Sequence, residues 1–371
     1  MKVALVYDRV NKWGGAERDL LALNEIFPDA PLFTSVYNPK LAPWAKKFPI
    51  VITSFLQKLP FARDRHEHFP YLMPLAFETF DFSKYDLVIS VTSEAAKGII
   101  TKPGTFHICY MLTPTRYLWS HHDFYFKNPP DSFKKYPLFS LLSKPIVSYL
   151  RNWDLVAAQR PDIIVAQSTE VKKRIKKYYG RDSTVIYPPV YIDKFKFNQH
   201  TNHQSQITDH YYLYVSRLIP YKRADLAIDA FNQLGLPLVI VGKGSEEKKL
   251  MNMAKPNIKF VRELTDSELA SYYQKTRALI FPQEEDFGLV VLEANAAGTP
   301  VIAYKAGGAL DTVIEGITGI FFERQEVNSL INAVNKFGKM NFDKKTLVKN
   351  AENFSKERFK SNFKNLVENV T

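Results

Sequence analysis

Two glutamates stand where a strand pattern gives way to a helix pattern. Glu285 and Glu293 lie in EEDFGLVVLEANAAG with seven residues between them, and Gly288 stands where the helical pattern begins. A helix N-terminus favours anions, but carboxylates beside it would repel a phosphate. They accept hydrogen bonds from hydroxyls, and a nucleotide sugar carries hydroxylated rings on both sides of its diphosphate. We therefore expect Glu285 to recognise one ring and Glu293 the other.

Two cations follow another strand pattern. Arg217 and Lys222 stand five residues apart in SRLIPYKR, at the end of the strand predicted over 211–217. Arginine can bind a phosphate through two donors and lysine acts as a point charge, so both could converge on one diphosphate. The alternative is solvated surface charge. The position at the end of a strand favours the functional interpretation.

Paired glycines, Gly14 and Gly15, follow the first strand pattern in YDRVNKWGGAERDL. They would let the backbone approach a ligand closely, and the helix start after them favours an anion or a negatively polarised oxygen. A tight turn is the alternative. The segment lacks the Gly-x-Gly-x-x-Gly fingerprint, which disfavours a dinucleotide-dependent dehydrogenase.

Alternating strand and helix patterns surround these residues. Strands are predicted at 2–7, 32–37, 86–91, 106–111, 162–168 and 184–190, then at 211–217, 236–242, 257–262, 278–283, 301–304 and 319–323. Several are continuously apolar, as in buried parallel strands. The alternation predicts an α/β protein with doubly wound parallel sheets, which bind ligands at the carboxyl ends of their strands.

A polar segment over 198–210 interrupts this alternation and is predicted to be a linker. The domains are then 1–197 and 211–352. The remaining 353–371 contains an amphipathic helix whose apolar face must pack on another element. The chain's 371 residues suffice for two domains with separate cores.

Composition restricts the compartment and the partners. The single cysteine, Cys109, lies in an apolar run, so no disulfide can form within the chain and a buried thiol is expected. No apolar run reaches about 18 residues, so we expect a cytoplasmic protein without a membrane span. A formal charge of +12 indicates anionic ligands, nucleic acid or an acidic membrane face. Neither a nucleic-acid recognition module nor a diagnostic metal-ligand spacing is present.

The motifs GGAE (14–17), SRLIPYKR, VIYPPV (185–190) and EEDFGLVVLEANAAGTPVIA occur in an order that resembles retaining glycosyltransferases of family 4, which have the GT-B fold. The resemblance covers nearly the whole chain. YLMPLAFETFDFSKYDLVIS, CYMLTPTRYLW and NWDLVAAQRPDIIVAQS further resemble the mannosyltransferase-like branch of bacterial surface polysaccharide synthesis. This implies two Rossmann-like domains facing across a cleft, with 353–371 returning to the first domain.

The resemblance also implies roles for residues at matching positions. Glu285 would contact the donor sugar, Glu293 the ribose, and Arg217 and Lys222 the diphosphate leaving group. The remaining donor-binding residues would be Gly14, Gly15, Phe287, Gly288 and Leu289. The reaction would retain the anomeric configuration and need no metal or other cofactor. The donor would be a nucleotide sugar, with GDP-mannose as the first choice and a UDP-sugar as the alternative.

The acceptor would be a lipid-linked saccharide or polysaccharide, with Arg116, Tyr117 and Trp119 on the acceptor side. The basic and aromatic segment 126–153 suits an anionic membrane surface, which implies a peripheral protein at the inner face of the plasma membrane. The alternative for this segment is a helix packed on its own domain. Leu112 replaces the histidine common in such enzymes, so a catalytically silent nucleotide-sugar-binding protein stays an alternative.

Overall fold

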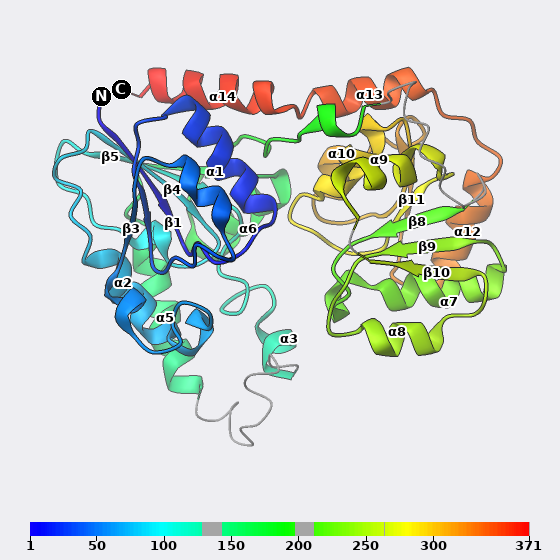
Figure 1. The fold of residues 1–371 in the computed structure, drawn as a ribbon, viewed down its shortest axis with the longest axis horizontal. Helices are drawn as coiled ribbons and strands as arrows, with labels where there is room; N and C mark the ends of the chain where they lie inside the picture. Colours follow the sequence, from blue (N-terminus) through cyan, green and yellow to red (C-terminus); the bar gives the residue numbers. More distant parts are fainter. Residues whose placement is uncertain (128–142, 197–210, 263, 371) are drawn as a thin grey trace. The chain divides into compact units, whose positions relative to one another are not determined.

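The structure, a computed structural model, describes residues 1–127, 143–196, 211–262 and 264–370. The chain forms two compact units (Figure 1). Unit 1 comprises Met1–Tyr187 and Lys360–Thr371, and unit 2 comprises Pro188–Phe359. The predicted linker, 198–210, lies outside the described residues.

Unit 1 is built on a parallel sheet whose described strands run in the order β3-β2-β1-β4-β5-β6-β7. The strands are β1 Val3–Tyr7, β2 Leu32–Thr34, β3 Val51–Thr53, β4 Leu87–Thr92, β5 Phe106–Met111, β6 Ile163–Ala166 and β7 Thr184–Val185. The central strands are fully buried because helices cover both faces of the sheet. Only β3, three residues long and next to β2 alone, was not predicted.

Helices of unit 1 take their ends from local signals. They are α1 Gly15–Ile26, α2 Met73–Glu78, α3 His122–Lys127, α5 Lys144–Ala157, α6 Thr169–Tyr179 and, across the boundary between the units, α14 Lys356–Glu368. The Ser168 hydroxyl caps α6 by accepting from the Val171 N–H, and Gly180 ends the helix in the left-handed region. Phe359 and Phe363 are the buried side of α14, and Phe363 lies against the Tyr110 ring in unit 1.

Unit 2 repeats this construction with a parallel sheet whose described strands run in the order β10-β9-β8-β11-β12-β13. The strands are β8 Tyr212–Val215, β9 Leu238–Val241, β10 Ile258–Val261, β11 Leu279–Phe281, β12 Val301–Tyr304 and β13 Gly319–Phe322. The prediction of two doubly wound parallel sheets is confirmed.

The helices of unit 2 also cover both faces of its sheet (Figure 1). They are α7 Ala224–Leu234, α8 Glu247–Met253, α9 Asp266–Lys275, α10 Leu289–Ala296, α11 Ala309–Thr312, α12 Val327–Phe337 and α13 Lys344–Glu352. α7 and α12 share one core with the sheet, while α9, α10 and α13 pack together on the other side. Among the described residues, no helix is long and apolar enough to cross a membrane.

Candidate active site

The loops that carry the predicted cations and carboxylates of unit 2 meet at one point of its sheet. The chain runs outward from β8 through β9 to β10 and then returns to β11, on the other side of β8. The order of strands therefore reverses between β8 and β11. Ligands of open α/β sheets bind where such a reversal leaves a crevice at the carboxyl ends of the strands. Lys222 follows β8 and Glu285 follows β11.

The structure brings these two side chains together. The Lys222 ammonium group and the Glu285 carboxylate form an ion pair, with 8% and 16% of their side chains exposed. The Lys222 ammonium also lies 4.9 Å from the centre of the Tyr221 ring, and the Tyr214 hydroxyl donates to the Lys222 carbonyl at 3.0 Å. This lysine is therefore held below the surface rather than solvated on it.

Arg217 stands on the exposed side of the same loop. Its guanidinium group donates to the Tyr221 hydroxyl at 3.1 Å. Tyr221 thus contacts both cations, one through its hydroxyl and the other through its ring. Sequence reasoning did not select Tyr221, although its position directly before Lys222 in PYKR would have allowed it.

Two positions near the Glu285 loop have backbone geometry or space that suits glycine. Gly288, which precedes α10, has a φ of 91°, a conformation that side chains rarely adopt. Gly308, after β12, donates its N–H to the Glu285 carbonyl at 2.8 Å. A Cβ at Gly308 would overlap the Phe287 backbone. The loop after β12 therefore supports the loop after β11, a relation that the sequence did not reveal.

The other predicted donor residues on this loop have different surroundings. Glu293 lies on α10 and is 4% exposed, and its carboxylate accepts from the Tyr273 hydroxyl at 3.2 Å. Phe287 is buried with its ring centre 5.8 Å from that of Phe354. Leu289 begins α10 and is half-buried. Glu285 is thus the more accessible of the two predicted carboxylates.

The GKGSEE segment after β9 supports the loop that carries Arg217. The Leu218 N–H donates to the Lys243 carbonyl at 3.0 Å, and the Glu246 N–H donates to the Leu218 carbonyl at 2.9 Å. In sequence this segment showed only a lone Gly-x-Gly. The structure makes it part of the surroundings of the β8 loop.

Unit 1 has a reversal of the same kind between β1 and β4. Arg9, after β1, forms an ion pair with Glu94, after β4, at 2.7 Å. Asp8 is 1% exposed, and its carboxylate accepts from the backbone N–H groups of 93–96 at 2.7–3.0 Å. Asp8 thereby fixes the turn that presents Glu94. Neither Asp8 nor this ion pair was predicted from the sequence.

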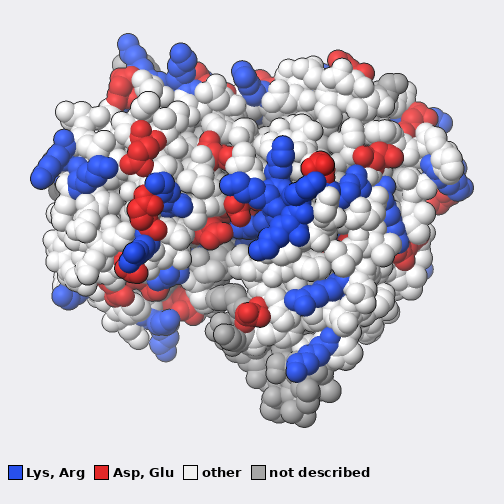
Figure 2. Space-filling model, turned by 180° about the vertical axis from the view of Figure 1, so that it is seen from behind, with Lys and Arg blue, Asp and Glu red and all other residues white. Residues whose placement is uncertain are grey.

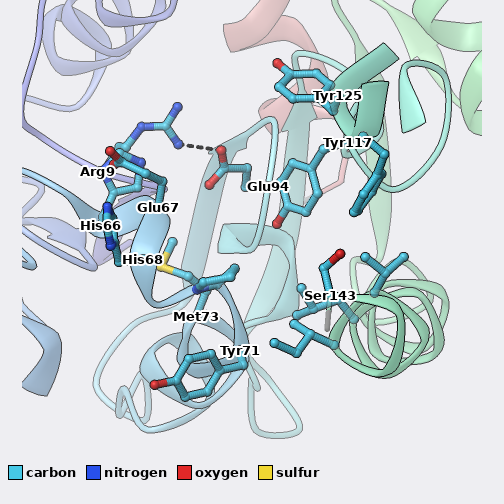
Figure 3. A pocket seen from close by; sticks show the side chains of 15 residues that line it. Arg9, His66, Glu67, His68, Tyr71, Met73, Glu94, Tyr117, Tyr125 and Ser143 are labelled. Carbon is cyan, nitrogen blue, oxygen red and sulfur yellow. Dashed lines mark ion pairs between the residues drawn. The ribbon is translucent and has the colours of Figure 1, made fainter. Parts of the chain in front are cut away.

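A cavity of about 340 Å³ opens beside the Arg9–Glu94 ion pair (Figure 3). Its wall is formed by apolar and aromatic side chains and a few polar ones: Arg9, His66, Glu67, His68, Pro70, Tyr71, Met73, Glu94, Tyr117, Tyr125, Phe126, Ser143, Ile146, Val147 and Leu150. Burial, and then the charges of Arg9 and Lys12, lower the pKa of His66 to about 2, so its imidazole is neutral at pH 7.

Of the residues predicted on the acceptor side, Tyr117 lines this cavity. Burial and then the Glu94 carboxylate raise the pKa of its phenol well above the usual value, so the hydroxyl stays protonated. Arg116 and Trp119 are not among the lining residues. The Trp119 indole instead donates to Asp154 at 2.7 Å.

Asp154 belongs to a buried network that holds the segment leading to Tyr117. Lys97 and Asp154, each 1% exposed, form an ion pair at 2.5 Å. The Thr115 hydroxyl donates to Asp154 at 3.0 Å and the Tyr179 hydroxyl at 2.6 Å. The network satisfies a charge pair that would otherwise be costly to bury. Residues from four segments of the chain form it, which sequence spacing could not reveal.

Gly14 and Gly15 lie at the start of α1. In the first turn, the buried Glu17 accepts from the Tyr7 hydroxyl at 2.8 Å. Negative charge therefore already occupies the first turn of this helix. Asp19 follows and is 2% exposed. Burial and then the Glu17 charge raise the Asp19 pKa well above its usual range.

Leu112 directly follows β5 and is 8% exposed. Its N–H donates to the Thr92 carbonyl at 2.8 Å, which continues the β4–β5 pairing by one residue. No group of three or more His, Cys, Asp or Glu side chains within the described parts of the chain is arranged to hold a metal ion.

Residues 195–354, which span most of unit 2, match the family model of glycosyl transferases group 1. This segment of unit 2 is similar to glycosyl transferases group 1. The Lys222–Glu285 ion pair and the Arg217 loop lie within the matched segment, and the predicted resemblance to glycosyltransferases is confirmed.

Relatives support the same family. The chain is 28% identical over 206 residues to an uncharacterized glycosyltransferase of Methanocaldococcus jannaschii, covering 54% of this chain and 56% of the relative. It is 27% identical to the GDP-mannose-dependent alpha-(1-6)-phosphatidylinositol monomannoside mannosyltransferase of Mycolicibacterium smegmatis, covering 47% and 52%. The chain thus spans about half the length of the curated relatives it matches.

A solved structure is similar in fold to this chain over both units. The crystal structure of Anabaena HepE in complex with UDP has a TM-score of 0.71 and 19% identity, with complete coverage of both chains. The two parallel-sheet units are therefore those of the GT-B fold.

Proposed function

We propose that this protein is a retaining glycosyltransferase that uses a nucleotide sugar, with GDP-mannose as the first choice. The observation that carries the proposal is the Lys222–Glu285 ion pair at the strand-order reversal of the segment that is similar to glycosyl transferases group 1. The pair supports the proposal because a diphosphate needs a cation and sugar hydroxyls need an acceptor such as a carboxylate.

The charges of the two loops suit departure of a nucleoside diphosphate. In the proposed reaction, the bond between the anomeric carbon and the diphosphate breaks and negative charge develops on the leaving oxygen. Lys222 and Arg217 stabilise this charge, so a metal ion is not needed. Glu285 accepts from donor-sugar hydroxyls and Glu293 from the ribose. Gly14, Gly15, Phe287, Gly288 and Leu289 complete the proposed donor contacts.

For the acceptor, we propose a lipid-linked saccharide or polysaccharide in cell-surface glycan synthesis. The cavity beside Arg9 and Glu94 offers apolar walls with a few polar groups, a composition typical of small-molecule sites. The mycobacterial relative's name includes a phosphatidylinositol-linked acceptor, which supports a lipid-linked class. We accordingly propose a cytoplasmic protein that binds the inner face of the plasma membrane.

The two donor hypotheses draw on different similar proteins. The name of the mycobacterial relative specifies GDP-mannose, whereas the Anabaena structure was solved with UDP. Thermal unfolding should be measured with GDP, UDP and ADP and with their sugars, because a ligand that binds only the folded state raises its stability. Stabilisation by UDP-glucose and not by GDP-mannose would overturn the first choice.

Transfer itself is tested with a labelled donor and a lipid-linked saccharide extract. We expect an α-linked product and free nucleoside diphosphate from the wild type. Glu285→Ala, and Arg217→Ala with Lys222→Ala, should each abolish transfer. Donor binding without turnover on any acceptor would instead support the catalytically silent alternative. In that case Leu112→His, at the position where such enzymes commonly have histidine, tests whether turnover can be restored.

A further inference from the structure

Unit 1 carries a strongly basic helix whose lysines do not line the cavity beside Arg9 and Glu94. Helix α6 exposes four lysines, Lys172, Lys173, Lys176 and Lys177. Arg174 is buried instead and pairs with Glu170 at 3.0 Å. Figure 2 shows Lys and Arg side chains gathered where α6 lies. One exposed carboxylate, Asp182, pairs with Lys176 at 2.9 Å, so lysine charge exceeds acidic charge on the exposed side of α6 among the described residues.

The neighbouring helix α5 exposes apolar side chains and no acidic ones. Tyr149 is 49% exposed, Leu155 38% and Val156 60%. Its single acidic residue, Asp154, is buried in the network described above. Apart from Lys144 and the partly exposed Arg151, whose guanidinium donates to the Leu118 carbonyl, the outer face of α5 is apolar or neutral.

Hydrogen bonds hold the ends of the two helices together. The Gln159 amide donates to the Tyr179 carbonyl, at the end of α6, at 3.0 Å. It also lies within 3.5 Å of the Leu155 carbonyl. Arg181, just after α6, donates to the Gln159 carbonyl at 3.0 Å. The exposed apolar side chains of α5 and the lysines of α6 are thus carried by two helices whose C-terminal ends are joined by hydrogen bonds.

We infer that this α5–α6 surface, formed by Tyr149, Leu155, Val156 and the four lysines of α6, docks on a bilayer that contains anionic phospholipid. The lysines would contact headgroups, while the apolar side chains of α5 would enter the interface. A purely ionic partner such as nucleic acid would leave the exposed apolar face of α5 unused. The inference gives a location to the membrane association included in the proposed function and rests on that part of it.

The test is co-sedimentation with vesicles of phosphatidylcholine containing 30% phosphatidylglycerol, compared with pure phosphatidylcholine, in the absence of any nucleotide sugar. Each lysine near such a surface contributes roughly a fivefold factor in partitioning. Lys173→Gln with Lys177→Gln should lower binding to anionic vesicles by about tenfold or more and weaken its salt dependence. Lys345→Gln with Lys349→Gln, on exposed positions of α13, is the matched control and should leave binding unchanged.

A second variant tests the apolar contribution. Leu155→Ser with Val156→Ser should weaken vesicle binding at every salt concentration. Equal binding to neutral and anionic vesicles would overturn the inference, as would a lysine variant that behaves like its control. So would equally tight binding of duplex DNA that needs the lysines but not Leu155 and Val156. Turnover on a water-soluble acceptor should be unaffected by the lysine changes, so failure of docking and failure of the transferase proposal are separable.

Discussion

Replacing Glu285 by glutamine should have opposite effects on nucleotide binding and on sugar transfer. In the structure, the Glu285 carboxylate neutralises Lys222. Under the proposed function, a bound diphosphate must replace this carboxylate as the ionic partner of Lys222. Glutamine keeps the size of the side chain and removes the competing charge. Nucleoside diphosphate should therefore bind more tightly, while transfer should be lost because the donor sugar loses its carboxylate partner.

The geometry sets the expected size of these effects. Opposite unit charges about 4 Å apart attract by about 4 kcal/mol at an effective dielectric constant of 20. Breaking a buried pair costs about 3–5 kcal/mol, and breaking an exposed one about 0–1 kcal/mol. Because the two side chains are 8% and 16% exposed, we expect Glu285→Gln to lower the free energy of unfolding by about 2 kcal/mol. Affinity for a nucleoside diphosphate should rise about tenfold, equivalent to about 1.4 kcal/mol.

Calorimetric titration with GDP and UDP, urea unfolding and turnover of a labelled donor measure the three effects separately. Glu284→Gln makes the same charge change at the exposed neighbouring residue and should alter each of them little. Lys222→Met should weaken diphosphate binding. The reasoning would be refuted if Glu285→Gln weakened diphosphate binding as much as Lys222→Met does.

Three further predictions concern particular positions. Gly308→Ala should reduce nucleotide binding at least about tenfold because the new Cβ would overlap the Phe287 backbone. Gly338→Ala should leave nucleotide binding unchanged because no atom lies nearer than 3.6 Å to its new Cβ. Calorimetric titration with a nucleotide compares the two variants. Folding raises the pKa of Asp19, so the contribution of Asp19 to stability falls as pH rises above about 4. Asp19→Asn should therefore stabilise the protein by about 1–3 kcal/mol at pH 7 but little at pH 4. Equal shifts of urea unfolding at both pH values would contradict this prediction. Burial raises the pKa of the Cys109 thiol to about 12. A thiol reagent at pH 8 should therefore modify the folded protein at least about 1000-fold more slowly than the unfolded chain. Rapid labelling of Cys109 without unfolding would refute its assignment as a buried thiol.

Much of the scaffold was predictable because parallel strands and covering helices leave local patterns. The twelve predicted strands are present, and the missed β3 is a three-residue strand at the edge. The loops after β8 and β11 were selected from the charged residues that follow two strand patterns, and the structure brings Lys222 and Glu285 of these loops together. Their residue types indicated phosphate and hydroxyl recognition because those ligands need cations and acceptors, whatever the exact geometry.

Local periodicity and residue type were enough to predict the alternation of strands and helices, the buried thiol and the residues at the ends of the strands. Which strand ends are neighbours became clear only from the folded sheets. β8 beside β11 pairs Lys222 with Glu285, and β1 beside β4 pairs Arg9 with Glu94. These partners are far apart in sequence, and strand order depends on the packing of the whole sheet, which no local pattern encodes.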